Sequence, residues 1–312
     1  MPVHGFNKPV DHHAGHMTWE LLFQESSRTV IETGELRAAG ATWRSLKAAV
    51  DNGFLVRGRR GHYALPSINQ RILEAVRVGG RLGCISAAAD VGIFAVDPSI
   101  AHIHLDPNAS RLRAPQDRFQ RLTVANRKGI ELHWDRLLAP EDGTEYSIGL
   151  VDALIQIFRC QQPRFALASL DNALHLQRLP LSGVAEIFAA LPEELQYLRS
   201  WVDTRSESGQ ETVLRFIVRL AGFQFEIQVS ISGVGRVDMV IEGCLVVEAD
   251  SRQFHDGWEA HLRDRTRDCD LAGMSYMSYR AIHRDILYHP ERVMAAIAGL
   301  LAVRNHFRTY VL

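Results

Sequence analysis

Three acidic residues near the C-terminus have the spacing needed to meet on one face of a β-sheet. Two strand-like runs flank Glu242-Gly243, a turn typical of a β-hairpin. With Gly243 at its centre, the hairpin sets Asp238 directly opposite Glu248. Asp250 points to the same side as Glu248, because side chains alternate along a strand. The pattern predicts a cluster of carboxylates.

Such a cluster is costly unless its charge is compensated. Neighbouring carboxylates repel one another, and each one is expensive to remove from water. A divalent cation would offset both costs, and ligands that are all oxygen suit Mg²⁺ or Mn²⁺. The alternative is a surface hairpin with solvated acids, which the apolar neighbours of Asp238 and Glu248 disfavour.

The elements around this hairpin can be predicted from the same segment. Ser208 is placed to cap a helix that continues to Gly222, and Glu211 stands three residues later, as in a capping box. Strand-like runs follow at 223–230, 235–241 and 244–249. A helix followed by a three-stranded sheet is therefore expected to position the acids.

Ordered motifs across residues 205–301 resemble the very-short-patch-repair-like endonuclease family known as domain of unknown function 559, within the PD-(D/E)XK nuclease superfamily. The matching positions are Arg205, Ser208, Glu211, Gln228, Gly235-Arg-Val-Asp238, Val247-Glu-Ala-Asp250, His255, Asp264-Arg-Thr-Arg-Asp268, Leu271-Ala-Gly273 and Asp285. The resemblance implies a restriction-endonuclease-like α/β domain. It makes Asp238 and Glu248 the core metal ligands and Glu211 a third acid that reaches in from the helix.

The same resemblance gives roles to four further residues. Asp250 would stand where related nucleases place lysine. His255 would lie near the scissile phosphate, where it could orient or activate water or protonate the leaving oxygen. Arg267 would hold a phosphate oxygen, steadied by Asp264 or Asp268. Because that lysine is absent, Gln228, His255 or an arginine must serve in its place, and Ser251 replaces the glycine that usually follows the Glu-x-Asp motif.

The N-terminal part of the chain has the element order of a winged helix. Helices are predicted from Thr18, from Thr33 and from Thr42, followed by a hairpin around the basic turn at 58–61. In that fold, one helix enters the major groove of DNA and the hairpin contacts phosphates. Candidate DNA-binding residues are Arg44, Lys47, Arg57, Arg59 and Arg60. The alternatives are a protein-docking role and an arginine-rich turn that is merely solvated.

This segment also resembles the winged helix of the AbiEi-type antitoxin and transcriptional-regulator family. The matching features are Gly40, Arg44-Ser-Leu, Asn52-Gly-Phe-Leu-Val-Arg57 and Arg60-Gly-His-Tyr-Ala-Leu65. The small-residue helix at 85–92 is similar to the one that follows the winged helix in the same family. The resemblance implies a DNA-binding module.

The segment between these two modules shows no catalytic motif. Strands are expected at 101–106 and 130–134, and helical periodicity runs through 147–201. His102, His104 and His133 lie on the expected strands, but no nearby cysteine or helical HxxxH pattern accompanies them. We interpret them as structural or surface histidines, and the helices as a connector.

Composition limits the remaining possibilities. The 312 residues are 46% hydrophobic and 23% charged with a net charge of −1, so DNA binding must come from local basic patches. The four cysteines are far apart, which favours reduced thiols in a cytoplasmic protein over a disulfide framework. No apolar run is long enough for a membrane span. Residues 1–17 have the character of a flexible leader, with a metal site at Asp11, His12, His13 and His16 as the alternative.

The sequence therefore predicts an α+β multidomain protein. Its expected parts are the leader, a winged helix at 18–66, a mixed middle region at 67–203 and a nuclease-like domain at 204–312. The predicted function is Mg²⁺- or Mn²⁺-dependent hydrolysis of DNA. The alternatives are a DNA-binding regulator or antitoxin-like protein with an inactive nuclease fold, and cleavage of RNA. A homodimer would suit double-strand cleavage, although no sequence feature requires it.

Overall fold

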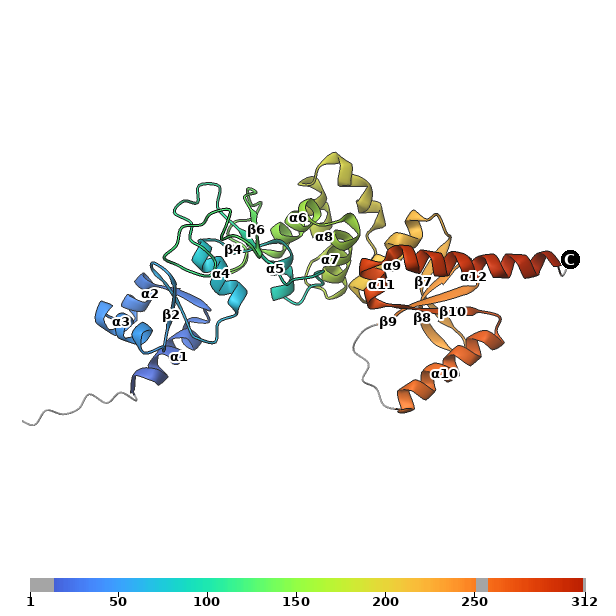
Figure 1. Cartoon of the computed structure of the whole chain (residues 1–312), viewed down its shortest axis with the longest axis horizontal. Coiled ribbons are helices and arrows are strands. Elements are labelled where there is room, and N and C mark those ends of the chain that lie inside the picture. Colours follow the sequence, from blue (N-terminus) through green and yellow to red (C-terminus); the bar gives the residue numbers. More distant parts are fainter. Residues whose placement is uncertain (1–13, 251–257, 311–312) are drawn as a thin grey trace, which may run out of the picture. The chain divides into compact units, whose positions relative to one another are not determined.

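The computed structural model describes residues 14–250 and 258–310 of a mixed α+β protein with several small sheets, as the sequence predicts (Figure 1). The chain divides into two compact units. The first comprises residues up to 87 together with 99–152, and the second comprises 88–98 together with the residues from 153 onward. The predicted middle region, 67–203, is thus shared between them. Among the described residues, no helix is both long and apolar enough to cross a membrane.

The N-terminal part of the first unit contains the three predicted helices and the predicted hairpin, together with a strand, β1, that was not predicted. The elements are α1 (Ala14–Ser26), β1 (Val30–Glu32), α2 (Thr33–Ala38), α3 (Trp43–Asp51), β2 (Val56–Arg59) and β3 (His62–Ala64). The three strands form an antiparallel sheet in the order β1-β3-β2. Apolar side chains of the helices and the sheet share one core, which includes Phe23, Leu36, Leu46, Leu55 and Tyr63.

Local signals account for the ends of these elements. The Thr42 hydroxyl accepts a hydrogen bond from the Ser45 amide, and the Ser45 hydroxyl accepts one from the Thr42 amide, so a capping box starts α3. Gly61 closes the hairpin with a positive φ of 91°. By contrast, α1 begins at Ala14, inside the segment expected to be a flexible leader.

The rest of the first unit contains a second three-stranded sheet. Helix α4 (Gln70–Val78) precedes β4 (Arg81–Leu82), α5 begins at Cys84 and ends at Asp90, and β5 (Ala101–His104) and β6 (Ile130–His133) follow. The strand order is β4-β5-β6, with β5 and β6 parallel. The connection between these parallel strands, residues 105–129, contains neither a helix nor a strand.

A run of helices follows, most of which lies in the second unit, and three of these helices begin at or directly after a proline. The elements are α6 (Leu150–Cys160), α7 (Pro163–His175), α8 (Leu181–Ala189) and the 3₁₀ helix η1 (Glu193–Trp201). Pro163 is the first residue of α7, and Pro180 and Pro192 immediately precede α8 and η1. Proline suits these positions because the first amide groups of a helix have no intrahelical acceptor. The helical periodicity predicted for 147–201 is thus divided into separate helices at these prolines.

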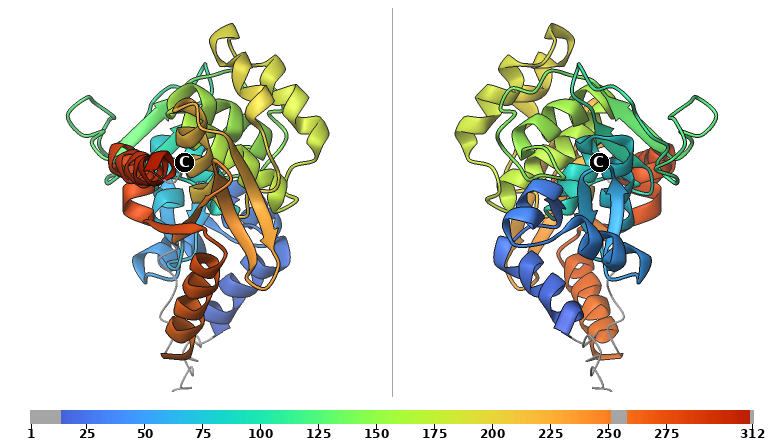
Figure 2. Two further views of the ribbon diagram at one scale, coloured as in Figure 1. Left: turned by 90° about the vertical axis from the view of Figure 1, so that its right-hand side faces the viewer. Right: turned by 90° about the vertical axis from the view of Figure 1, so that its left-hand side faces the viewer.

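A four-stranded sheet forms the C-terminal half of the second unit. Helix α9 (Gly209–Leu220) leads into β7 (Phe225–Ile231), β8 (Gly235–Ile241) and β9 (Leu245–Asp250), and α10 (Trp258–Gly273), β10 (Met277–Ile282), α11 (His283–Tyr288) and α12 (Pro290–Tyr310) follow. The strand order is β10-β9-β8-β7, with β10 parallel to β9 and the other pairs antiparallel. Figure 2 shows β7 and β8 as a long hairpin.

Candidate active site

Asp238 lies where the pairing between β8 and β9 stops. The ladder runs through Ile241↔Leu245, Val240↔Val246 and Met239↔Val247, which is the register centred on Gly243 that the sequence predicts. Continued by one step, this register sets Asp238 opposite Glu248. At that step the ladder ends, and the Ala249 amide donates to the Asp238 carboxylate at 2.9 Å. The open end of the hairpin therefore presents the two predicted acids side by side on neighbouring strands.

Glu211 reaches the same region from the start of α9. The Ser208 hydroxyl caps this helix by accepting from the Glu211 amide at 3.3 Å. The expected return bond differs by one residue, because the Glu211 carboxylate accepts from the Glu207 amide and not from that of Ser208. The same carboxylate oxygen accepts from the Gln228 side-chain amide at 2.8 Å. These bonds fix the direction of the Glu211 side chain.

Gln228 has an unusual backbone conformation for a strand residue. Its φ is +54°, although Ile227 and Val229 on either side pair regularly with β8. A left-handed residue other than glycine costs about 1–3 kcal/mol and is often found at functional sites. Here the twist occurs opposite Asp238 and accompanies the hydrogen bond from Gln228 to Glu211. The backbone is strained where the predicted acids meet.

Glu248 is held by two arginines. Its carboxylate lies 2.8 Å from Arg267 of α10 and 3.2 Å from Arg280 of β10. Arg267 also donates to the carbonyl of Arg236, and its Nε is buried without a hydrogen-bond partner within the described part of the chain. The resemblance predicted that Asp268 or Asp264 would steady Arg267. Instead, Asp268 pairs with Arg280 at 3.3 Å, and the side chain of Asp264 is outside the described residues.

The electrostatics of the two central acids reflect this crowding. Burial, followed by the nearby charge of Glu211, raises the pKa of Asp238 to about 6, although the Ala249 amide and Arg267 oppose the rise. Burial also raises the pKa of Glu248, against the lowering effect of Arg267 and Arg280. A carboxyl group with a raised pKa in a polar pocket is a feature of catalytic and cation-binding sites. It also occurs in structural ion-pair networks, such as the one around Glu248.

Asp250 and His255 complete the predicted set. Asp250 is the exposed last residue of β9, and its backbone is paired with Ile282 of β10. His255 lies outside the described residues, as does Ser251. The structure therefore brings together Glu211, Gln228, Asp238, Glu248 and Arg267, and leaves Asp250 at the edge of this group.

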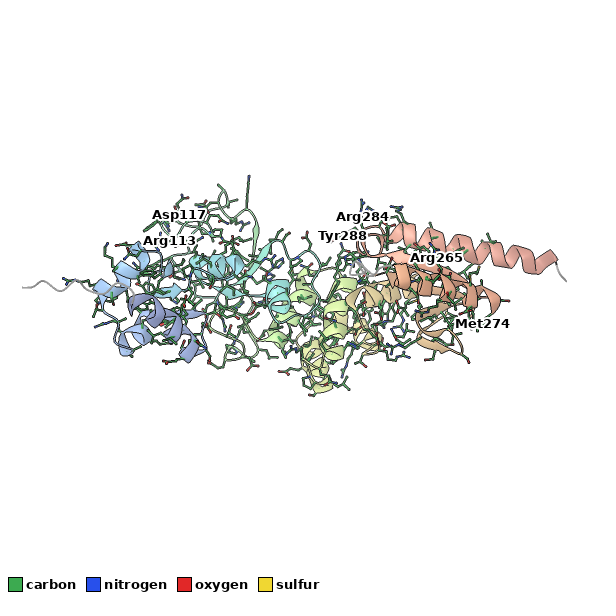
Figure 3. The ribbon with its side chains drawn as sticks, turned by 90° about the horizontal axis from the view of Figure 1, so that it is seen from below. Arg113, Asp117, Arg265, Met274, Arg284 and Tyr288 are labelled. Carbon is green, nitrogen blue, oxygen red and sulfur yellow. The ribbon has the colours of Figure 1, made fainter. Side chains whose placement is uncertain are left out.

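The five candidate DNA-binding residues are not equivalent. Arg44, Lys47 and Arg60 are exposed, as a phosphate contact requires. Arg57 is half-buried and lies 5.8 Å from the centre of the Tyr63 ring. The Arg59 guanidinium packs against Gly79, and burial together with Arg113 (labelled in Figure 3) lowers the pKa of Arg59. Arg57 and Arg59 are thus partly buried against their own unit and less available to a phosphate than the exposed three.

A group of metal-ligating side chains in the first unit was not predicted from the sequence. Cys84, His102 and His133 are buried, and their ligand atoms lie within 4.8 Å of one another. They belong to a group that could hold a metal ion, and among the described residues the acids around Asp238 do not form a second group of this kind. His102 and His133 are therefore not surface residues. A histidine on each of two predicted strands was the only signal, because Cys84 is distant in sequence.

Comparison with known proteins gives relatives but no function. No family model matches the chain. Two proteins of Mycobacterium tuberculosis, "Uncharacterized protein MT2308" from strain CDC 1551 / Oshkosh and "Uncharacterized protein Rv2248" from strain ATCC 25618 / H37Rv, are each 28% identical to it over 277 residues. The match covers 82% of this chain and 96% of each relative. Because 82% of the chain exceeds either unit, the similarity extends into both.

Proposed function

We propose that the protein is a divalent-cation-dependent endonuclease that hydrolyses DNA. The observation that carries the proposal is the half-buried Asp238 at the open end of the β8–β9 hairpin, opposite Glu248 and within the electrostatic reach of Glu211. The order α9-β7-β8-β9-α10-β10 supports it, because a nuclease domain of the PD-(D/E)XK type is expected to place its acids on such a hairpin. The exposed cations of α3 and the β2–β3 hairpin support a DNA-binding winged helix.

The donor atoms at this site suit Mg²⁺ or Mn²⁺. Glu211, Asp238 and Glu248 offer only carboxylate oxygens, the ligands preferred by hard cations. Burial, followed by the nearby charge of Glu211, raises the pKa of Asp238, and a bound cation would offset both costs of ionising this carboxyl group. We assign these three acids as cation ligands. When bound, the cation would polarise the phosphate and lower the pKa of a water molecule.

The remaining residues have roles that do not depend on the cation. Gln228 orients Glu211 through their hydrogen bond. Arg267 is suited to holding a phosphate oxygen, since its guanidinium is planar, permanently charged and only partly satisfied by protein acceptors. In this arrangement the acids would bind the cation, and Arg267 would bind the negatively charged phosphate of the same substrate.

Glu248→Gln tests the proposed chemistry directly. Full-length protein is expected to cleave DNA with Mg²⁺ and not with EDTA, and Glu248→Gln should lower the rate by about 10²–10⁴-fold. Substrates are matched duplex DNA, mismatched duplex DNA and RNA. The control is Asp270→Asn, which removes an exposed acid of α10 and should cleave normally. Equal cleavage by wild type and Glu248→Gln would reject the assignment.

DNA binding by the first unit is tested separately from cleavage. Replacing Arg44, Lys47 and Arg60 together by alanine should weaken binding and lower the slope of log K against log[salt] by about 0.9 for each phosphate that is no longer neutralised. Fluorescence anisotropy at several salt concentrations measures both quantities. Arg178→Ala, an exposed arginine of the second unit, is the control. An unchanged salt slope in the triple variant would exclude these side chains as phosphate-binding groups.

The ion pairs of Glu248 favour a second candidate function. Two arginines occupy the carboxylate that a cation would need, so the same fold could serve as an inactive platform in a DNA-binding regulator. This alternative predicts sequence-specific binding of DNA without any product under Mg²⁺ or Mn²⁺. The cleavage assay above distinguishes the two candidates.

A further inference from the structure

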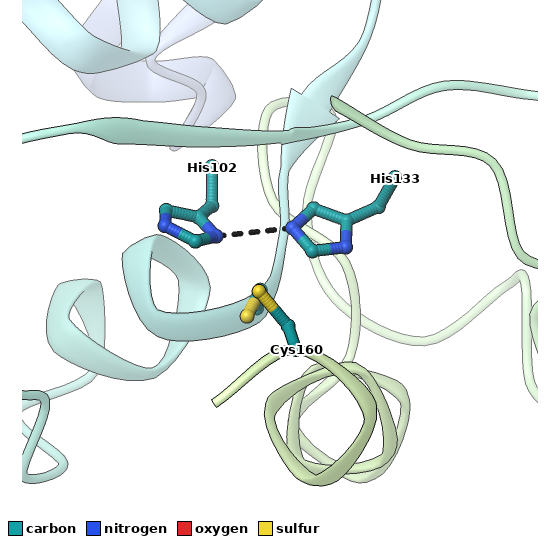
Figure 4. A group of neighbouring side chains, drawn as sticks. His102, His133 and Cys160 are labelled. Carbon is teal, nitrogen blue, oxygen red and sulfur yellow. Dashed lines mark hydrogen bonds between the residues drawn. The ribbon is translucent and has the colours of Figure 1, made fainter. Parts of the chain in front are cut away.

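Cys84, His102 and His133 come from three separate segments of the first unit. Cys84 is the first residue of α5, His102 lies in the middle of β5, and His133 is the last residue of β6. The exposed fractions are 0%, 6% and 8%. The His102 Nδ1 and His133 Nε2 atoms are 3.0 Å apart, and the rings are stacked with centroids 5.2 Å apart (Figure 4). A buried thiol and two imidazoles thus meet at one point.

The backbone is arranged to produce this meeting. Parallel pairing of β5 with β6 sets His104 opposite His133 and His102 opposite Glu131. His102 and His133 are therefore on adjacent strands, offset by two residues along the ladder. The Ser86 hydroxyl accepts from the His102 amide at 2.9 Å, which ties β5 to α5. Cys84 has a φ of +47°, an uncommon conformation for a residue with a side chain. The strained turn places its thiol next to the two rings.

The distances are close to those of a tetrahedral metal site. With Zn–N bonds of about 2.0–2.1 Å and tetrahedral angles, two ligand nitrogens are about 3.3 Å apart. The observed 3.0 Å between the histidine nitrogens requires only a small separation to admit an ion. Nitrogen and sulfur donors suit Zn²⁺ and other late transition metals, whereas Mg²⁺ prefers oxygen. These donors therefore differ in kind from the carboxylates of the second unit.

A metal ion bound by these three residues would also stabilise the irregular connection between β5 and β6. Parallel strands are usually connected by a helix that covers the sheet, but residues 105–129 connect β5 to β6 without one. A long irregular connection is costly in conformational entropy and gains from a cross-link near its ends. His102 and His133 flank this connection, and Cys84 would join both to α5.

We propose that Cys84, His102 and His133 bind a Zn²⁺ ion that stabilises the first unit. Three protein ligands leave the fourth corner of a tetrahedron to a water molecule. The site does not depend on the proposed nuclease function, because none of its residues belongs to the second unit's acid cluster. Its ligands hold the connection between β5 and β6 against the start of α5.

Metal analysis of the full chain, purified without a metal-affinity tag, tests the site. Wild-type protein should contain about one zinc per chain, and Cys84→Ser or His102→Asn should lower the content at least about tenfold. The matched controls are Cys244→Ser and His104→Asn. Cys244 is a buried cysteine of the second unit, and His104 is a buried histidine of the same strand as His102 that is not in the group. Both controls should retain zinc.

A second measurement covers variants that fail to fold. Wild-type protein is stripped with a chelator and titrated with Co²⁺, which gives a thiolate-to-metal absorption band when cysteine is a ligand. The band should appear at one equivalent, and Zn²⁺ should displace it and raise the melting temperature. Absence of zinc from the native protein together with no Co²⁺ band, or zinc contents equal in wild type and Cys84→Ser, would overturn the proposal.

Discussion

Arg215→Met is expected to lower the free energy of unfolding by about 3–5 kcal/mol. Arg215 of α9 forms an ion pair with Asp171 of α7, and the exposed fractions of the two side chains are 4% and 0%. Asp171 also accepts from the Thr212 hydroxyl and the Asp203 amide. Removing the arginine leaves the buried Asp171 carboxylate without its cation. Burial raises the pKa of Asp171 even with Arg215 present, so its unpaired charge would be costly. Urea denaturation followed by circular dichroism measures the loss.

A nearby exposed pair provides the control. Arg205 binds Asp203 at 2.7 Å, but the Arg205 side chain is 64% exposed. Arg205→Met should therefore cost about 0–1 kcal/mol. In the double variant Asp171→Leu/Arg215→Met, part of the loss should be recovered, since no unpaired charge remains. Similar losses for Arg205→Met and Arg215→Met would contradict the importance assigned to burial.

Asp238→Asn should strongly slow DNA cleavage and yet make the protein more stable at neutral pH. Asparagine keeps an oxygen that can accept from the Ala249 amide, and it carries no charge near Glu211. The cleavage rate should fall by about 10²–10⁴-fold. The free energy of unfolding at pH 8 should rise by about 1–3 kcal/mol, since each pKa unit corresponds to about 1.4 kcal/mol. Gains of this kind are typical when a residue is retained for function.

The pH dependence of this gain follows from the direction of the shift. The pKa of Asp238 rises from 3.8 to about 6 on folding, so the native state binds the proton more tightly than the unfolded state does. Below about pH 4 both states are protonated, and wild type and Asp238→Asn should be equally stable. The difference should grow between about pH 4 and pH 6 and stay constant above that. A constant difference from pH 3 to pH 8, or a loss of stability at pH 8, would contradict the shift.

The features that could be predicted from the sequence are those determined by residues close together in the chain. Glu242 and Gly243 have positive φ values of 50° and 62°, and this turn alone determines that Asp238 faces Glu248. Ser208 caps α9 and so places Glu211. These features depend on neighbours within a few residues of the chain.

Features that depend on distant segments could not be predicted in the same way. Glu248 obtains its arginines from α10 and β10, which are separated from it in the sequence and reach it only through tertiary packing and strand pairing. The left-handed conformation of Gln228 has no signature in residue type, because glutamine is ordinary in a strand. The meeting of Cys84 with His102 and His133 requires parallel pairing of two strands that are separated by a long irregular loop.

The two arginines that bind Glu248 have a consequence for how the C-terminal sheet folds. Their charges already balance that carboxylate, so the C-terminal sheet does not need a bound cation in order to fold. Under the proposed function, newly made chains would complete this half of the molecule even when divalent ions are scarce. Binding of the activating cation would then be a separate, later event.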